Sequence, residues 1–241
     1  MKKLALLCLP GLLTAFAGAQ SLSVDFNPGD FVTGPISGQG SFTSGGGQVI
    51  SDPMDPFGNQ FLTMGAAGFG TGAVYTMPAG FGVPQSFSMD FSIDVHPTAN
   101  TFGPVEFFVQ FNGWNNFIAM KWDERSDVAG TVSLEARVSG DVSPVVDDGF
   151  TIAFNQMHTL DFVLNASGTA GTFSLNGTEL VTLTSLGTMD WTAGPSIQFL
   201  HQRANVTIDS FSATAIPEPS TYALLFGTLF LGLAGWRRFR R

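Results

Sequence analysis

The stretch Ser88-Met89-Asp90-Phe91-Ser92-Ile93-Asp94-Val95 alternates strictly between polar and apolar side chains. Because successive residues of a β-strand point to opposite faces of a sheet, its apolar residues would share one face and its polar residues the other. One-sided alternation of this kind is typical of antiparallel sheets that cover a core with one face. The stretch therefore predicts a strand with one buried face and one polar face.

The same period of two recurs along much of the chain, at residues 105–111, 134–138, 160–164, 173–175, 197–199 and 206–211. Turn-forming pairs separate these segments, among them Asn112-Gly113, Asp148-Gly149 and Asn176-Gly177. Short connections between one-sided strands predict an all-β domain over residues 20–216, in which antiparallel sheets stack as a β-sandwich.

Residues 20–216 are strongly acidic, with 18 acidic residues against four basic ones and a net charge of about −14. Since nucleic acids carry negative phosphates, this charge argues against DNA or RNA as a partner. The single cysteine, Cys8, lies before this segment. We therefore expect packing or bound ions, rather than disulfides, to stabilise the domain.

Residues 1–19 have the features of a secretory signal peptide. Two lysines precede the apolar residues 4–16, and the small residues Ala17 and Ala19 form a cleavage site. Cleavage after Ala19 would make Gln20 the first residue of an exported protein.

The segment 217–241 forms a third region. Pro217-Glu218-Pro219 precedes an apolar run at residues 222–235, and an arginine cluster follows, made of Arg237, Arg238, Arg240 and Arg241. A helix over residues 221–236 would span about 24 Å, and Trp236 and the arginines would settle at the membrane interface. The positive-inside rule then leaves the arginines in the cytoplasm and the domain outside. An amphipathic or buried helix is the alternative, but the leucines and phenylalanines surround the helix instead of forming one stripe.

These three parts, in this order, resemble the PEP-CTERM sorting signal of Gram-negative bacteria. The resemblance covers residues 217–241 and implies an exosortase as partner, with Pro217, Glu218 and Pro219 as its recognition element. Residues 222–235 would then be the membrane helix and the four arginines the cytoplasmic stop. It also implies a membrane tether before processing and a final place at the cell surface or in the extracellular matrix, where members of the family are often associated with exopolysaccharide.

Residues 85–214 resemble a concanavalin A-like jelly roll of the laminin-G or glucanase type. The resemblance rests on residues 85–95, 157–162, 171–177 and 206–211. It implies that the upstream segments 24–26 and 38–42 pair with the C-terminal strand.

Glucanases of this architecture carry two or three acids on alternate residues of one strand, as Glu-x-Asp-x-x-Glu, and the chain has no such string. Asp90 and Asp94 share the polar face of one predicted strand, and Glu106 and Gln110 share that of another. If these side chains line a concave groove, they could bind sugar hydroxyls or act as acids. The alternative is that they lie on ordinary sheet faces and are only solvated.

Other candidates for a ligand site are isolated. Trp114 lies in the polar segment 112–116. An exposed indole there suits a partly solvated ligand site, because its ring is apolar and its N–H is a hydrogen-bond donor. His96, His158 and His201 are scattered without metal-ligand spacing, and we interpret His158 as making a structural hydrogen bond.

Calcium is the ion that the acidic composition favours, because it takes hard oxygen ligands. Asp25 and Asp209 would come close if the first and last strands pair, and further acids cluster at residues 123–127 and 147–148. A structural calcium ion is therefore the one cofactor that we predict.

Together these features favour an exported, non-enzymatic protein of the cell surface or matrix, with a structural or adhesive role and polysaccharide as a candidate ligand. The alternative is a secreted glycoside hydrolase on the same sandwich, with its acids drawn from Asp90, Asp94 and Glu106. A carrier of a pigment or small molecule would need an apolar pocket.

Overall fold

The structure is a computed structural model that describes residues 20–51, 59–65, 69–95, 105–111, 117–122, 130–138, 141–142, 146–165, 170–184 and 196–215, with 227–229, 232 and 236. Several predicted features lie outside these residues: the signal peptide with Ala17 and Ala19, His96, Trp114, the acids at 123–127, Pro217, Glu218, Pro219, Arg237, Arg238, Arg240 and Arg241. Among the described residues, no helix has both the length and the apolar character needed to cross a membrane.

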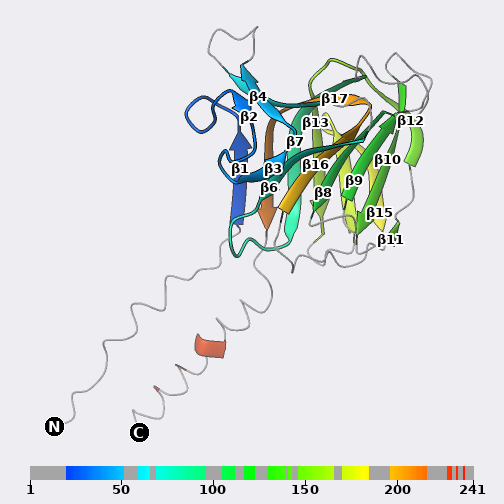
Figure 1. Ribbon diagram of the computed structural model, residues 1–241. Coiled ribbons are helices and arrows are strands. Elements are labelled where there is room, and N and C mark those ends of the chain that lie inside the picture. The colour runs from blue at the N-terminus through cyan, green and yellow to red at the C-terminus, as the bar shows by residue number, and fades with distance from the viewer. Residues whose placement is uncertain are drawn as a thin grey trace, which may run out of the picture.

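The described strands form two antiparallel sheets (Figure 1). Sheet I has the order β15-β14-β13-β7-β17-β5-β4-β2, and β1 pairs with β17 beside this path. Its strands are β1 (Gln20–Asp25), β2 (Gly34–Pro35), β4 (Gln48–Ser51), β5 (Gln60–Gly65), β7 (Pro84–Val95), β13 (His158–Leu164), β14 (Ala170–Leu175), β15 (Thr178–Thr184) and β17 (Ala204–Ala215).

Sheet II has the order β11-β10-β9-β8-β16-β6-β3, and β12 pairs with β10. Its strands are β3 (Phe42–Gly45), β6 (Phe69–Thr76), β8 (Val105–Phe111), β9 (Phe117–Trp122), β10 (Gly130–Val138), β11 (Asp141–Val142), β12 (Val146–Ile152) and β16 (Ser196–Gln202). The all-β antiparallel architecture expected from the alternating sequence is thus confirmed.

The core lies between the two sheets and is rich in phenylalanine. Six of the predicted inward residues of β7 and β8 are at most 1% exposed, and a seventh, Val105, is 7% exposed; the six are Met89, Phe91, Ile93, Phe107, Val109 and Phe111. Phe211 of sheet I meets two rings of sheet II edge to face, with centroid distances of 5.3 Å to Tyr75 and 5.2 Å to Phe199. Edge-to-face contacts are a favoured arrangement of aromatic rings, so they help to fix how one sheet lies on the other.

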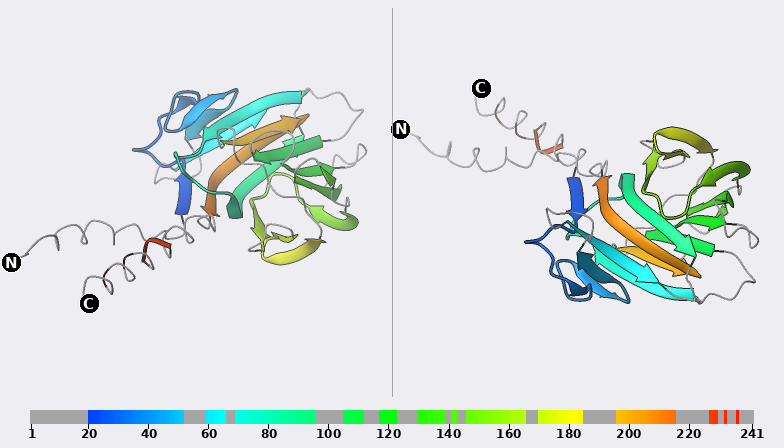
Figure 2. Two further views of the ribbon diagram at one scale, coloured as in Figure 1. Left: turned by 90° about the horizontal axis from the view of Figure 1, so that it is seen from below. Right: turned by 90° about the horizontal axis from the view of Figure 1, so that it is seen from above.

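The first and last strands of the domain lie side by side, as the views in Figure 2 show. β1 pairs with β17 from Gln20↔Ala215 to Asp25↔Ser210, which confirms the predicted pairing with the C-terminal strand for Val24 and Asp25 and ends just before Phe26. The same prediction is wrong for residues 38–42. Phe42 begins β3 and pairs with Tyr75 of β6, because its ring belongs to the aromatic cluster on the sheet II side.

The predicted turns have different outcomes. Asn176 and Gly177 connect β14 to β15 with φ angles of 51° and 76°. Two successive positive φ angles are the mark of a type I′ hairpin turn, so this prediction is confirmed. Asp148-Gly149 instead lies within β12, where the pairing with β10 is irregular. A bulge accommodates the extra residues there, so a glycine in this strand did not signal a turn.

Candidate functional site

The three acidic residues singled out as possible catalysts lie on opposite surfaces of the sandwich. Asp90 and Asp94 alternate with the buried Phe91 and Ile93, so they face outward from sheet I. Glu106 alternates with buried residues of β8 and faces outward from sheet II. Since stacked sheets are about 10 Å apart and these side chains point away from each other, Glu106 cannot act together with either aspartate.

Asp90 is a structural carboxylate. Thr159 Oγ1 donates a hydrogen bond of 2.6 Å to Asp90 Oδ1, and Ser210 Oγ donates one of 3.1 Å to Oδ2. The two donors belong to β13 and β17, the strands on either side of β7. Both carboxylate oxygens are therefore engaged in holding three strands of sheet I together.

The same face carries further hydrogen bonds between short side chains. Ser88 Oγ donates to Asp161 Oδ1 at 2.6 Å, and the hydroxyls of Ser86 and Thr214 are 2.5 Å apart. These residues satisfy one another across β7, β13 and β17. In this part of the outer face, the polar side chains are hydrogen-bonded to one another.

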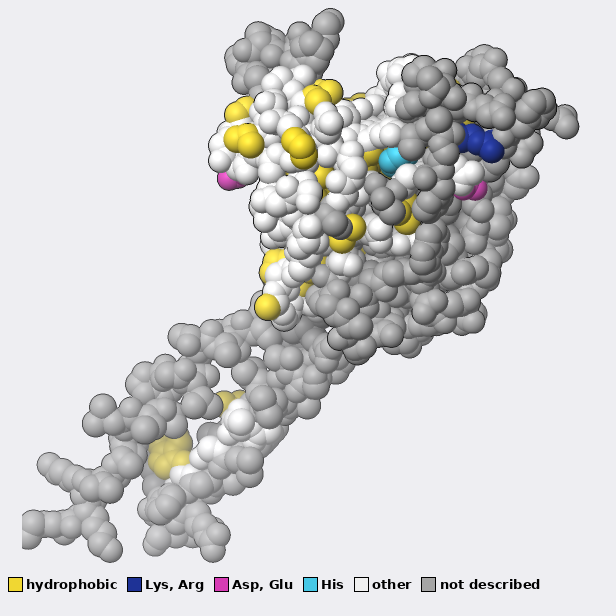
Figure 3. Space-filling view, in the orientation of Figure 1, with side chains coloured by type: hydrophobic (Ala, Val, Ile, Leu, Met, Phe, Trp, Pro, Cys, Tyr) yellow, Lys and Arg dark blue, Asp and Glu magenta, His cyan; other side chains and the backbone are white. Residues whose placement is uncertain are grey.

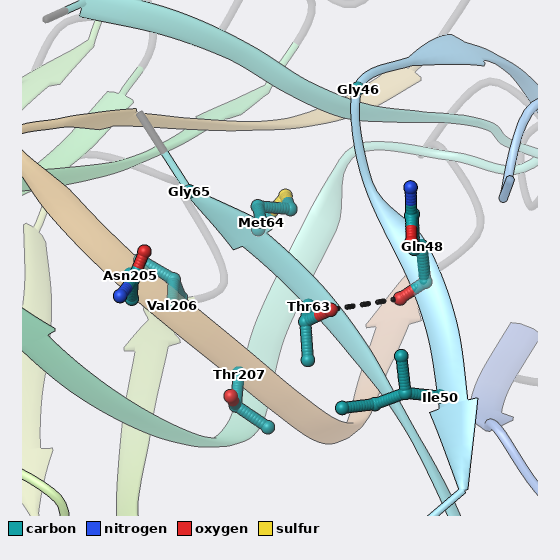
Figure 4. A pocket seen from close by; sticks show the side chains of 9 residues that line it. All are labelled: Gly46, Gln48, Ile50, Thr63, Met64, Gly65, Asn205, Val206 and Thr207. Atoms are coloured by element: carbon teal, nitrogen blue, oxygen red, sulfur yellow. Dashed lines mark hydrogen bonds between the residues drawn. The ribbon is translucent and has the colours of Figure 1, made fainter. Parts of the chain in front are cut away.

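Farther along the same face, an open groove of about 450 Å³ lies over β4, β5 and β17 (Figure 4). It is lined by Gly46, Gln48, Ile50, Thr63, Met64, Gly65, Asn205, Val206 and Thr207. The strand register explains this grouping, because Thr63 pairs with Thr207 on one side and with Gln48 on the other. Asp94 is the cross-strand partner of Asn205, so a carboxylate stands next to the groove.

The groove combines polar groups with a small apolar surface. Thr63 Oγ1 donates to the backbone oxygen of Gln48 at 3.2 Å. The side chains of Gln48, Asn205 and Thr207 have no hydrogen-bond partner within the described part of the chain. Each amide can both donate and accept, and Ile50, 40% exposed, adds an aliphatic contact. The groove can therefore receive a ligand that offers hydroxyl groups and an apolar face.

Of the two alternatives for the polar residues of β8, a solvated sheet face or the lining of a groove, the solvated face is wrong. Glu106 is only 9% exposed and Gln110 only 1% exposed. Their cross-strand partners on β16 are Gln202 and Gln198. β8 and β16 are interior strands of sheet II, so their outward side chains have neighbours on both sides. Gln110 Nε2 is buried and finds no acceptor among the described residues.

His158 makes the structural hydrogen bond expected of it. Its Nε2 lies 2.8 Å from the carbonyl oxygen of Ala153, and its Nδ1 lies 3.1 Å from Asn176 Nδ2. Nε2–H therefore donates to Ala153 and Nδ1 accepts from Asn176. His201 is 3% exposed and lies on the face of β16 that is turned toward the core, opposite Phe107 of β8.

The two aspartates proposed as calcium ligands lie on neighbouring strands. Asp25 is exposed and pairs with Ser210, and Asp209 falls at the irregularity in the pairing of β17 with β7. Within the described ranges, no group of three or more His, Cys, Asp or Glu residues could hold a metal ion.

Asn205 and Thr207 were not singled out as ligand contacts from the sequence. Their alternation with the apolar Val206 and Ile208 does place them on the outer face. What the sequence could not show is that β5 and β4 follow β17 across the sheet and complete the groove.

Comparison with known proteins gives one family match. Residues 215–241 match the model of the PEP-CTERM protein-sorting motif. This confirms the predicted sorting tail, and it indicates an exported protein that is anchored at its C-terminus before processing. No curated protein sequence matches the chain.

Several solved structures are similar to the chain. A carbohydrate esterase from the Shiga toxin-encoding bacteriophage phi24B has a TM-score of 0.51 at 16% identity, covering 82% of this chain and 99% of the esterase chain. Peanut lectin has a TM-score of 0.49 at 14% identity, covering 82% and 97%. The β-glucanase of Bacillus licheniformis has a TM-score of 0.48 at 14% identity, covering 81% and 98%. The chain thus has the concanavalin A-like jelly-roll sandwich that its sequence predicted.

Proposed function

We propose that this exported chain, with its PEP-CTERM motif at residues 215–241, is a non-enzymatic module of the cell surface or extracellular matrix that binds polysaccharide. The binding site is the groove over β4, β5 and β17. The observation that carries the proposal is the pair Asn205 and Thr207, whose polar groups line this groove without a partner among the described residues.

The groove suits a sugar in both size and chemistry. Its volume of about 450 Å³ lies within the range of roughly 300–1,000 Å³ that small-ligand pockets occupy. A pyranose presents neighbouring hydroxyls, which pair well with amide groups that donate and accept, and C–H faces that contact a side chain such as Ile50. Both amide side chains, Gln48 and Asn205, stand at the groove.

Two features support a role without catalysis. Both oxygens of Asp90 are engaged by Thr159 and Ser210. Glycosidases with two carboxylates hold them roughly 5–9.5 Å apart on either side of the scissile bond. Asp94 and Glu106 face outward from different sheets and do not form such a pair.

A secreted glycoside hydrolase is the second candidate function. It is favoured by one observation on sheet II, where the buried Glu106 lies on the same outward face as Gln110, whose Nε2 has no acceptor among the described residues. In that case Glu106 would be the acid to test.

The decisive experiment screens the full chain on a glycan array and on a panel of polysaccharides for hydrolysis. We expect binding without turnover. Asn205→Ala and Thr207→Val should weaken binding at least fivefold, whereas Ser212→Ala, on the same strand and face but outside the groove, should not. Hydrolysis that Glu106→Gln abolishes would overturn the proposal in favour of the enzyme.

Processing and calcium complete the proposal. An exosortase would recognise the tail after the C-terminal segment has anchored the protein in the bacterial membrane, and would release it to the surface or matrix. A calcium ion held by Asp25 and Asp209 would raise the melting temperature by several degrees through binding linkage. The same melt with a chelator, and with Asp25→Asn, tests this ion.

A further inference from the structure

The chain enters and leaves the sandwich at one point. Gln20, the first residue after the predicted signal peptide, is the cross-strand partner of Ala215, where the match to the sorting motif begins. Figure 1 shows β1 and β17 ending at the same end of the sandwich. The predicted signal peptide and the predicted sorting tail are therefore attached at neighbouring positions of the folded domain.

The spacer between the fold and the predicted membrane helix is short. Ala215 is fully buried as the last residue of β17, and five residues, 216–220, separate it from the helix expected over residues 221–236. Since an extended residue spans at most about 3.6 Å, this connection reaches at most roughly 20 Å. The end of the sandwich would therefore stand within that distance of the membrane that holds the helix.

This end is fixed by contacts that resist fraying. Gln20 Oε1 accepts a hydrogen bond of 2.8 Å from the backbone N–H of Gly82, in the loop that leads to β7. On the other side of β17, Ala215 pairs with Pro84 at the start of β7. The first residue of β1, the last of β17 and this loop thus form one unit.

The same unit carries no charged side chain, although the domain as a whole is strongly acidic. It consists of residues 20–23, 77–87, 162–164 and 213–215, which we call the seating end; none of them is Asp, Glu, Lys or Arg, and the one charge that cleavage after Ala19 would add is the positive α-amino group of Gln20. On sheet II, Arg137 of β10 and Asp141 of β11 lie toward the same end of the sandwich. In Figure 3 the described side chains next to the two tails are white and yellow, and the magenta and blue side chains that this view shows lie higher on the domain.

The nearest described carboxylates on sheet I, Asp161 and Glu179, are set back from this end. Both lie level with Ser212, which is three residues before Ala215 on β17. At about 3.4 Å per residue this is a distance of about 10 Å, close to one Debye length at physiological salt. Charge repulsion across such a distance is largely screened.

We propose that the seating end is a membrane-contact surface, and that the domain stands end-on upon anionic lipid while its tail is intact. A domain with a charge of about −14 is repelled by an anionic leaflet. The seating end, which has no acidic side chain and includes the exposed loop residues Pro78 and Ala79, is the part that can approach the lipid at the lowest electrostatic cost. The inference rests on the sorting tail and does not depend on the proposed ligand.

The orientation also determines which part of the domain points outward. Asn205 lies ten positions before Ala215 on β17, roughly 30 Å up the strand. The groove would therefore open away from the lipid, where matrix polymers are within reach.

Site-specific fluorescence tests the orientation. The full chain with Cys8→Ser is produced in a host without an exosortase, with a single cysteine at Ala79 or at Gln156. Gln156 is exposed in the turn at the opposite end, where the N–H of Asn155 bonds to the carbonyl of Ile93. Each protein is labelled with a small fluorophore and inserted into phosphatidylcholine–phosphatidylglycerol vesicles that contain a headgroup-linked quencher.

We expect the label at Ala79 to be quenched at least threefold more than the label at Gln156. A matched variant with ten Gly/Ser residues inserted before Pro217 should lose most of this difference, because the longer tether frees the domain. Equal quenching at both positions, or stronger quenching at Gln156, would overturn the proposal. If the spacer variant keeps the full difference in quenching between Ala79 and Gln156, the short connection does not hold the domain end-on, and that part of the proposal is wrong.

Discussion

Asn176 Nδ2 donates a hydrogen bond of 3.1 Å to Nδ1 of His158, which joins the turn between β14 and β15 to strand β13. The carboxamide oxygen of Asn176 also accepts from the backbone N–H of Thr159 at 2.9 Å. One turn residue therefore connects three strands, and its φ of 51° is a conformation that asparagine tolerates better than most residues.

Asn176→Ala should destabilise the domain by about 2–4 kcal/mol, because it removes two side-chain hydrogen bonds and strains the left-handed backbone. Thermal unfolding should show a melting temperature lower by roughly 5–12 °C. Asn176→Gly keeps the backbone freedom and should lose less. Equal losses for alanine and glycine would show that the φ angle contributes nothing.

Gly72→Ala should also destabilise the fold, for a steric reason. A Cβ at this position of β6 would collide with the carbonyl oxygen of Phe199 and with Met64 Sδ. We expect a loss of about 1–3 kcal/mol in urea unfolding, as is usual for overpacking. Ser23→Ala, at an exposed position of β1, is the control. A Gly72→Ala protein as stable as this control would contradict the close approach of β6 to β16.

Asp90→Ala should separate stability from binding. The hydroxyls of Thr159 and Ser210 lose their acceptor, at an expected cost of about 1–3 kcal/mol. Asp161→Ala removes only the bond from Ser88 and should cost less. Neither variant should change the affinity for a polysaccharide found on the array. A loss of affinity in Asp90→Ala, beyond that in Asp161→Ala, would mean that the aspartate belongs to the ligand site.

Gln110→Met should stabilise the protein. Its Nε2 is buried without an acceptor among the described residues, and an apolar side chain of similar shape removes that penalty. We expect a gain of about 1 kcal/mol, measured as a higher midpoint of urea unfolding. Gln198→Met, at its half-buried partner on β16, should give no gain. A loss of stability in Gln110→Met would show that the amide is satisfied, for example by water.

The inward faces of the strands could be predicted because alternation is a local property. Met89, Phe91 and Ile93 needed no knowledge of the neighbouring strands, and all three are buried. The alternation of Val206 and Ile208 likewise places Asn205 and Thr207 on the outer face. The turn at Asn176-Gly177 was equally local, since its two positive φ angles follow from the residue types.

Which face of which sheet each strand joins is a long-range property, and here the sequence was insufficient. Asp94 and Glu106 looked equivalent as polar residues of alternating strands, yet they belong to different sheets. The groove beside Asn205 depends on β5, a strand about 140 residues earlier in the chain. The burial of Gln110 likewise follows from the interior position of β8 in sheet II, which no local pattern encodes.

The pairing of Gln20 with Ala215 makes this domain suitable for transplantation. Its entry and exit are about 5 Å apart, the separation of residues opposite each other in an antiparallel ladder. The domain could be inserted into a surface loop of an unrelated host protein without forcing the host's loop ends apart. Equally, a short linker from Ala215 to Gln20 would close the chain, and new termini opened between Asn176 and Gly177 would give a circular permutant with the same two sheets.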